Sequence, residues 1–302
     1  MLVRMFRVRV AFGIGLFVAT SMLAAQSVPG VRNSEGVSLV VTDEDTQPVL
    51  HLLLPDESGG QVAKILFPEH VTLKRRGNDE GEHLYLFRPG KTGERPMWRQ
   101  AGNAIEYERD FRGGIHMLAR ATLEEDGALF HYEFLNGSDV DYAMVTAVTD
   151  PRMVSILHDV RLERTYVHHA GGFELLASET PQRLTMPLDK WLPARYLASY
   201  TGPVPEQLVE RRADGITYYN KSLVVNEPLI ATISSDKKWV VMSFTKVTGN
   251  VWSNPELTCQ HVDPEKPLPP HGKTVIEVKI LVFKGTLDQT LTKMKAQRPL
   301  LQ

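Results

Sequence analysis

The sequence predicts an all-β protein built on a large curved sheet, with a short helix at its C-terminus. Most segments alternate apolar and polar residues with a period of two, and turns rich in Gly, Pro and Asp separate them. Only two segments show helical spacing. Several of the alternating runs are eight residues or longer, which suits a large sheet better than a small sandwich.

The expected strands follow one another along most of the chain. They cover residues 37–42, 49–54, 63–67, 71–74, 83–87, 142–148, 160–167, 216–225, 229–233, 239–245 and 274–283. The clearest hairpin spans residues 115–135, where Asp126-Gly127 is a favourable pair for a two-residue turn. A turn at that pair would place Leu123 opposite Phe130 and gather the other apolar side chains on the same face.

The two helical segments differ in strength. Residues 187–198 have roughly helical spacing, but Pro193 limits any helix there to a turn or two. Near the C-terminus, Thr286 and Gln289 form a capping-box pattern, and an apolar stripe follows it. This pattern predicts a helix over residues 286–297.

The N-terminus is typical of a secretory signal peptide over residues 1–25. Three arginines precede an almost unbroken apolar run over residues 10–22, and small residues follow at Ala24 and Ala25. An uncleaved membrane anchor is the alternative, although the run is short for a span of about 20 residues. We expect an exported bacterial protein, periplasmic or secreted, with no membrane span after cleavage and a single domain over residues 26–302.

Composition excludes some classes of partner and chemistry. The chain has 34 Lys+Arg against 36 Asp+Glu, and loss of the leader arginines makes it more acidic, which argues against nucleic acid as the main partner. Cys259 is the single cysteine, so no intramolecular disulfide can form, and it is expected to be an inert core residue. Phosphate-loop, nucleophile-elbow and H-E-x-x-H patterns are absent.

One predicted strand has an unusually polar face. Alternation places His158, Arg164 and His168 on the same side of the strand over residues 160–167, and His116 on the hairpin would extend this face. It is either a solvated sheet face or the floor of a groove for a hydroxylated ligand. In the groove, imidazoles would act as acid–base groups and the guanidinium would hold a carboxylate.

A second candidate lies in residues 251–264. If this segment is extended, His261 and Asp263 point the same way with Cys259 beside them, and a carboxylate that orients a histidine makes an acid–base unit. The alternative is an Asp-Pro turn with an incidental histidine. A metal site that joins this pair to one of the strand histidines has no support from ligand spacing. We therefore expect neither a metal ion nor an organic cofactor.

Tryptophans near these polar groups bear on the class of ligand. Trp98, Trp191 and Trp252 lie in predicted loops or at strand ends, and a flat apolar face beside hydrogen-bonding groups suits a sugar ring. Core packing is the alternative for each of them. The candidate catalytic residues are His158, His168, His261 and Asp263, and the candidate substrate-binding residues are Arg164, Trp191, Trp252, Asn254 and His116.

Residues 251–294 resemble the C-terminal part of secreted bacterial proteins of the galactose mutarotase-like superfamily. The matching features are Asn254-Pro255, Cys259-Gln260-His261, Asp263-Pro264, the turn Pro269-Pro270-His271-Gly272, and a long strand that ends at Phe283-Lys284-Gly285-Thr286-Leu287-Asp288. The resemblance implies a β-supersandwich and a carbohydrate ligand. Members include aldose epimerases, glycoside hydrolases, polysaccharide lyases and non-catalytic sugar binders. In the epimerases a Glu base acts with His partners, and we match no residue of this chain to that Glu.

Three functional hypotheses follow. The first is a carbohydrate-active protein that binds a sugar or oligosaccharide on a concave sheet face, with His-centred acid–base catalysis of the epimerase, lyase or glycosidase type. The second is a non-catalytic carbohydrate-binding protein that uses the same face. The third is a structural or assembly module whose polar face is merely solvated. Convergence of His158, His168 and His261 in one cleft would favour the first.

The leader gives the first testable prediction. Mass spectrometry of the exported protein should find an N-terminus close to Gln26 or Ser27, because a signal peptidase cuts after small residues. An intact Met1 in the membrane fraction would instead establish an uncleaved anchor.

Overall fold

The computed structural model describes residues 29–42, 47–55, 60–86, 96–180 and 182–302, and the predicted leader lies outside them. Most of its elements are strands in one nine-stranded, one five-stranded and two four-stranded sheets. The nine-stranded sheet runs β14-β13-β18-β19-β22-β10-β9-β8-β7. In chain order these strands are β7 (Arg99–Ala101), β8 (Ala104–Phe111), β9 (Ile115–Glu124), β10 (Gly127–Asn136), β13 (Thr165–His169), β14 (Gly172–Leu175), β18 (Leu229–Ile233), β19 (Trp239–Phe244) and β22 (Lys273–Lys284).

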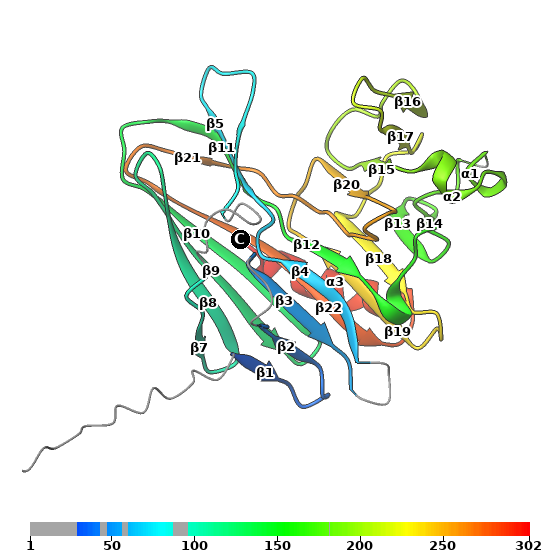
Figure 1. Cartoon of the computed structure of the whole chain (residues 1–302), viewed down its shortest axis with the longest axis horizontal. Coiled ribbons are helices and arrows are strands. Elements are labelled where there is room, and N and C mark those ends of the chain that lie inside the picture. The colour runs from blue at the N-terminus through cyan, green and yellow to red at the C-terminus, as the bar shows by residue number, and fades with distance from the viewer. Residues whose placement is uncertain (1–28, 43–46, 56–59, 87–95, 181) are drawn as a thin grey trace, which may run out of the picture.

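The smaller sheets cover one face and the ends of this large sheet (Figure 1). The five-stranded sheet contains β1 (Gly30–Arg32), β2 (Ser38–Val40), β3 (Val49–Leu53), β4 (Gln61–Leu66) and β12 (Asp150–Met153). One four-stranded sheet orders β21 (Lys266–Leu268), β11 (Tyr142–Ala147), β5 (Val71–Arg75) and β6 (Glu82–Leu84). The other orders β16 (Val209–Arg211), β17 (Thr217–Asn220), β15 (Ala194–Ser199) and β20 (Asn250–Ser253), with β15 and β17 parallel.

Helices are few and short. They are α1 (Gln182–Thr185), α2 (Leu188–Trp191) and α3 (Leu287–Gln297), with 3₁₀ turns η2 (Ser155–Leu157) and η3 (Arg298–Leu300). The capping box that predicted α3 is confirmed, since the Gln289 backbone N–H donates to Thr286 Oγ1 and the Thr286 N–H donates to Gln289 Oε1. No helix in the described part of the chain is long and apolar enough to cross a membrane. The predicted all-β supersandwich with a short C-terminal helix is confirmed.

Two hydrophobic cores lie on opposite faces of the nine-stranded sheet. The larger one packs this sheet against the five-stranded sheet, with Phe67 in contact with the rings of Tyr107, Phe130 and Tyr132. The smaller one packs Met294 of α3 against the opposite face, behind the sheet in Figure 1. The interior strand β19 is therefore buried at every position, as expected of a strand that is covered on both faces.

The β9–β10 hairpin corrects the predicted register. Glu124 pairs with Gly127, so the turn lies at Glu125-Asp126, and Phe130 pairs with Ala121 instead of Leu123. The shift is of two residues, and an even shift leaves each side chain on its predicted face. Ala119, Ala121, Tyr132 and Phe134 are accordingly all buried.

Gly127 serves a neighbouring strand instead of the turn. A Cβ at this position would lie 2.0 Å from the carbonyl oxygen of Ile280 on β22, and Gly127 has a φ of +146°. Only a glycine lets the backbone of β22 approach this closely. The prediction of a turn at Asp126-Gly127 was therefore wrong. A glycine is required at position 127 by the close approach of Ile280, about 150 residues later in the chain.

Two further elements are shorter than predicted. The strand expected over residues 160–167 begins only at Thr165, because the Asp159 carboxylate accepts the backbone N–H groups of Glu163 and Arg164 and holds a turn. The helical stretch expected over residues 187–198 is the single turn α2, followed after Pro193 by strand β15.

Gly127→Ala should lower the free energy of unfolding by about 2–4 kcal/mol, because neither strand can yield without breaking the sheet pairing. Chemical denaturation with the unfolding monitored by circular dichroism measures this. Gly102→Ala is the matched control, since its φ is +62° but nothing lies within 4 Å of the added Cβ, so it should cost only about 1 kcal/mol. Equal losses would show that backbone conformation, and not the approach of β22, requires Gly127.

Candidate functional site

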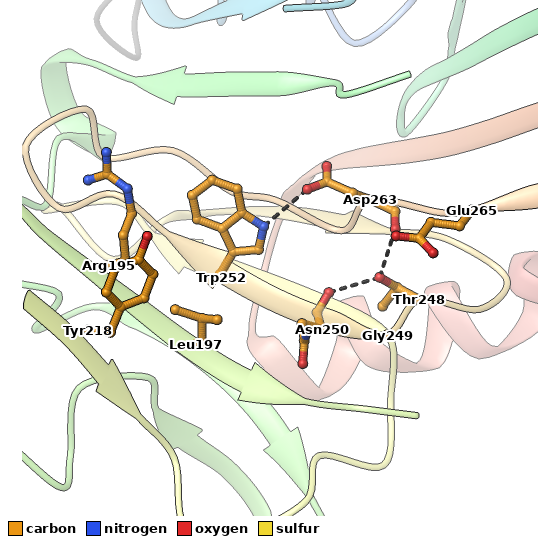
Figure 2. A pocket seen from close by; sticks show the side chains of 9 residues that line it. All are labelled: Arg195, Leu197, Tyr218, Thr248, Gly249, Asn250, Trp252, Asp263 and Glu265. Atoms are coloured by element: carbon orange, nitrogen blue, oxygen red, sulfur yellow. Dashed lines mark hydrogen bonds between the residues drawn. The ribbon is translucent and has the colours of Figure 1, made fainter. Parts of the chain in front are cut away.

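A cavity of about 280 Å³ lies where β15, β17 and β20 meet the segment that follows His261 (Figure 2). It is lined by Arg195, Leu197, Tyr218, Thr248, Gly249, Asn250, Trp252, Asp263 and Glu265. Figure 2 shows the Trp252 indole in the middle, with Arg195 and Tyr218 on one side and the two acidic residues on the other. One aromatic surface is therefore flanked by polar groups of both charges.

Trp252 is held in place by its backbone partner His261. The two residues form an antiparallel bridge, in which Trp252 N–H donates to His261 O at 3.2 Å and His261 N–H donates to Trp252 O at 2.9 Å. Directly paired residues have adjacent side chains, and here the rings stack with centroids 3.8 Å apart and an interplanar angle of 9°. The imidazole is buried, and the half-buried indole lies between it and the cavity.

Asp263 and Glu265 line the cavity because side chains alternate between the two sides of the extended segment that follows His261. The intervening residues Val262 and Pro264 are buried, while both acidic residues line the cavity. The Trp252 Nε1–H donates to Asp263 Oδ2 at 3.0 Å, and His261 Nδ1 lies 3.5 Å from Asp263 Oδ1. The Asp263 side chain thus fixes the edge of the indole and remains 21% exposed.

Asp150 lies on the other side of His261 and completes a row of charges. His261 Nε2 is 3.3 Å from Asp150 Oδ1, and Asp150 Oδ2 accepts Arg152 Nε at 2.6 Å. Arg152 in turn donates to Glu69 Oε1 at 2.8 Å. The Asp150 and His261 side chains are each only 1% exposed. A buried charge is stable only when paired, and each charge in this row has an opposite neighbour.

The pKa of His261 is raised and the pKa of Asp150 is lowered, and both shifts favour the charged form. Burial alone would lower the pKa of His261, but the Asp263 and Asp150 carboxylates on its two sides raise it well above the ordinary histidine value. Burial alone would raise the pKa of Asp150, but His261 and Arg152 lower it. The charged forms favoured by these shifts are an imidazolium at His261 and a carboxylate at Asp150.

Cys259 adds a third potential ligand to this pair. The ligand atoms of Asp150, Cys259 and His261 all lie within 4.8 Å of one another. Asp150 is already paired with both His261 and Arg152, so the charges of the trio balance without a metal ion. Burial raises the pKa of the Cys259 thiol, and its sulfur accepts the Asn254 backbone N–H at 3.2 Å. This environment is that of a structural cysteine.

The other candidate catalytic residues do not reach this cavity. His158 is exposed after η2, and His168 on β13 contacts Asn226 Oδ1 through Nδ1 at 2.7 Å. Arg164 donates to the carbonyl oxygens of Ile156 and Ile233 at 3.1 and 2.7 Å, so it ties a turn to β18. The expected shared strand face does not form, because the strand starts only at Thr165.

The remaining predicted binding residues lie elsewhere too. Trp191 on α2 is buried and packs edge-on against Tyr196 with centroids 6.3 Å apart. Asn254 is buried beside Cys259. His116 on β9 contacts Asp110 Oδ1 through Nδ1 at 2.8 Å, in the nine-stranded sheet. Of the predicted set, the cavity is lined by Trp252 and Asp263 alone, with His261 directly behind them.

Several residues that line the cavity were not predicted from the sequence. Glu265 follows His261 and Asp263 at the same spacing of two, so alternation would have found it. Arg195 and Tyr218 are opposite each other in the parallel pairing of β15 with β17, which no local pattern predicts. Arg195 Nη1 is bound by the Glu256 carboxylate and by its own neighbour's carbonyl, Ala194 O, at 2.7 Å.

The architecture is that of a large β-sandwich built on a nine-stranded sheet. No protein-family model matches the chain, and no curated protein sequence matches it. Among solved structures, it is similar to a galactose mutarotase related enzyme from Lactobacillus acidophilus, with 9% identity, a TM-score of 0.48, and coverage of 86% of this chain and 98% of that one.

Two further solved structures have the same kind of name. A GalM/aldose epimerase homologue from C. elegans is 10% identical with a TM-score of 0.46, and the match covers 86% of this chain and 99% of that one. A putative aldose 1-epimerase from Escherichia coli K12 is 11% identical with a TM-score of 0.45 and the same two coverages, 86% and 99%. These names belong to the superfamily that the sequence motifs resemble.

His261→Gln gives a pH-dependent prediction. Because the folded pKa of His261 is raised, the proton bound there stabilises the native state fully below about pH 6.5, and this contribution declines as pH rises through the folded pKa. The variant should lose about 3–5 kcal/mol at pH 6, because Asp150 and Asp263 lose their shared cation. Its deficit relative to wild type should shrink at alkaline pH.

Denaturant unfolding of both proteins from pH 6 to pH 10 measures this difference. His271→Gln is the control, since His271 is an exposed residue whose Nε2 contacts Asp139, and its difference from wild type should stay within about 0.5 kcal/mol. A deficit for His261→Gln that does not change with pH would contradict a charged imidazole.

Proposed function

We propose that this chain is an exported protein that binds a sugar ring in the cavity above Trp252. The observation that carries the proposal is the half-buried indole in a cavity whose rim offers guanidinium, phenol, amide and carboxylate groups. A sugar ring has apolar C–H faces and a belt of hydroxyl groups, so it requires such a combination. The signal-peptide pattern supports export.

The rigidity of the indole favours this role. Stacking on His261, the hydrogen bond to Asp263 and the backbone bridge all fix Trp252 before any ligand arrives. A preorganised side chain loses little conformational entropy on binding. The volume of about 280 Å³ lies near the lower end of small-molecule sites, roughly 300–1,000 Å³. It suits one sugar ring better than several.

Acid–base catalysis is the second candidate function, and the row Asp150–His261–Asp263 favours it. His261 is covered by Trp252, so Asp263 is the member of the row that would touch a ligand and move a proton. The imidazolium would act as a positioning residue that orients Asp263 through the 3.5 Å contact. The chemistry would be of the epimerase, lyase or glycosidase type that the sequence resemblance implies.

Trp252→Ala tests the binding proposal. Calorimetric titration with a panel of hexoses, hexosamines and hexuronates should find at least one ligand for the wild-type protein. The variant should bind it at least about tenfold more weakly, because truncation of a central aromatic contact costs about 2 kcal/mol or more. Trp98→Ala is the matched control, since this half-buried indole packs against Phe67 and Tyr107.

Failure of the wild-type protein to bind any member of the panel would overturn the proposal. So would equal losses of affinity in the Trp252 and Trp98 variants, once circular dichroism shows that both are folded. For the catalytic candidate, Asp263→Asn should lower the turnover of a neutral sugar about 10²–10⁴-fold while the variant still binds that sugar. Absence of turnover by a wild-type protein that binds the sugar would favour the non-catalytic alternative.

A further inference from the structure

The charges around the cavity discriminate between classes of sugar, an inference that rests on the proposed function. The only cavity-lining cation among the described residues, Arg195, is already paired with Glu256, whose side chain is 26% exposed. The Glu256 carboxylate offsets the charge of this guanidinium through Nη1, and the same nitrogen donates to the Ala194 carbonyl oxygen, so the net attraction of Arg195 for a ligand anion is reduced. The cavity therefore lacks an unpaired cation for the carboxylate of a uronic acid.

Two carboxylates face the same space. Asp263 has one neighbour on each oxygen, the Trp252 Nε1–H and the His261 Nδ1, which leaves further lone pairs toward the cavity. Glu265 is exposed and makes no ion pair with any residue in the described parts of the chain. Lys266, its neighbour in sequence, directs its Nζ to the carbonyl oxygen of Val275 at 2.7 Å.

The groups behind the cavity do not offset these carboxylates. The connected charges include Arg212, whose guanidinium lies over the Tyr218 ring, and its partner Glu210. The cations are Arg195, His261, Arg152 and Arg212, and the anions are Glu256, Asp263, Glu265, Asp150, Glu69 and Glu210. Four positive against six negative charges leave a net charge of −2 around the site. Field lines from such a set concentrate in a concave, partly buried space, so the cavity attracts cations and repels anions.

We propose that the cavity selects a sugar with a protonated amino group, a hexosamine, over the corresponding neutral hexose and hexuronate. The sugar ring lies on the Trp252 indole, and the ammonium group contacts the carboxylates of Asp263 and Glu265. The face of the Trp252 indole that is turned away from His261 adds to the attraction for a cation. This reverses the expectation from the sequence, in which Arg164 would hold a ligand carboxylate.

Calorimetric titration at pH 6 and low salt tests the order of affinities. The ligands are glucosamine and galactosamine, the neutral parents glucose and galactose, and glucuronate and galacturonate. Within the gluco series and within the galacto series, the hexosamine should bind at least roughly fivefold more tightly than the hexose, since a charged contact of about 1 kcal/mol gives that factor. The uronate should bind most weakly. N-acetylglucosamine, which lacks the charge, should bind no more tightly than glucose.

Two variants assign the preference to the cavity. Glu265→Gln should reduce the hexosamine-to-hexose ratio by about threefold or more, whereas Glu108→Gln on β8 makes the same change of charge outside the cavity and should leave the ratio unchanged. Salt at about 0.5 M should weaken hexosamine binding more than hexose binding, because it screens the carboxylates.

The outcomes separate this inference from the proposed function. If the uronate binds as tightly as the hexosamine, or if Glu265→Gln leaves the ratio unchanged, while Trp252→Ala still weakens binding as predicted, then the charge selection is wrong and sugar binding stands. If none of these sugars binds the wild-type protein, both proposals fail. The order hexosamine, hexose, uronate, sensitive to Glu265 and to salt, supports both.

Discussion

The stacked pair of Trp252 and His261 is the contact on which the rest of the candidate site depends. An imidazolium is costly to bury, and this one is stable because Asp150 and Asp263 lie on its two sides and the indole covers its face. The same contacts fix the indole as the floor of the cavity and hold the Asp263 carboxylate at its edge. One buried cation thus organises both the aromatic and the acidic part of the site.

The site also depends on the way the large sheet is covered. Phe67 and its ring contacts fill the core between the nine-stranded and five-stranded sheets, while α3 covers the opposite face behind β19 and β22. Asp150 begins β12 at the edge of the five-stranded sheet, and Trp252 lies on β20 in a four-stranded sheet. The row from Asp150 to Asp263 therefore joins two sheets across a buried, low-dielectric boundary, where electrostatic interactions are strong.

Local pattern predicted those features whose physical cause is local. The capping box and apolar stripe of α3 involve residues within one or two turns, and both are present in the structure. Alternation along an extended chain correctly placed His261 and Asp263 on one side, and the faces of the β9–β10 hairpin follow from the same rule. The predicted register of that hairpin was wrong because Gly127 is required by the close approach of the β22 backbone and does not form the turn. The prediction of a polar strand face was wrong because the Asp159 carboxylate accepts two backbone N–H groups in a turn, so that the strand begins only at Thr165.

Period-two alternation and capping are properties of neighbouring residues, so an all-β chain with a C-terminal helix could be predicted from local pattern. The predicted site residues included Trp252, His261 and Asp263, which meet at the cavity, and six others that lie elsewhere. Which charges meet depends instead on how the sheets pack. Asp150 reaches His261 from 111 positions earlier in the chain, Glu256 neutralises Arg195, and the parallel pairing of β15 with β17 brings Tyr218 beside Arg195. These contacts set the protonation of His261 and the acidic character of the cavity. No local pattern records them, because they arise only when sheets distant in sequence pack together.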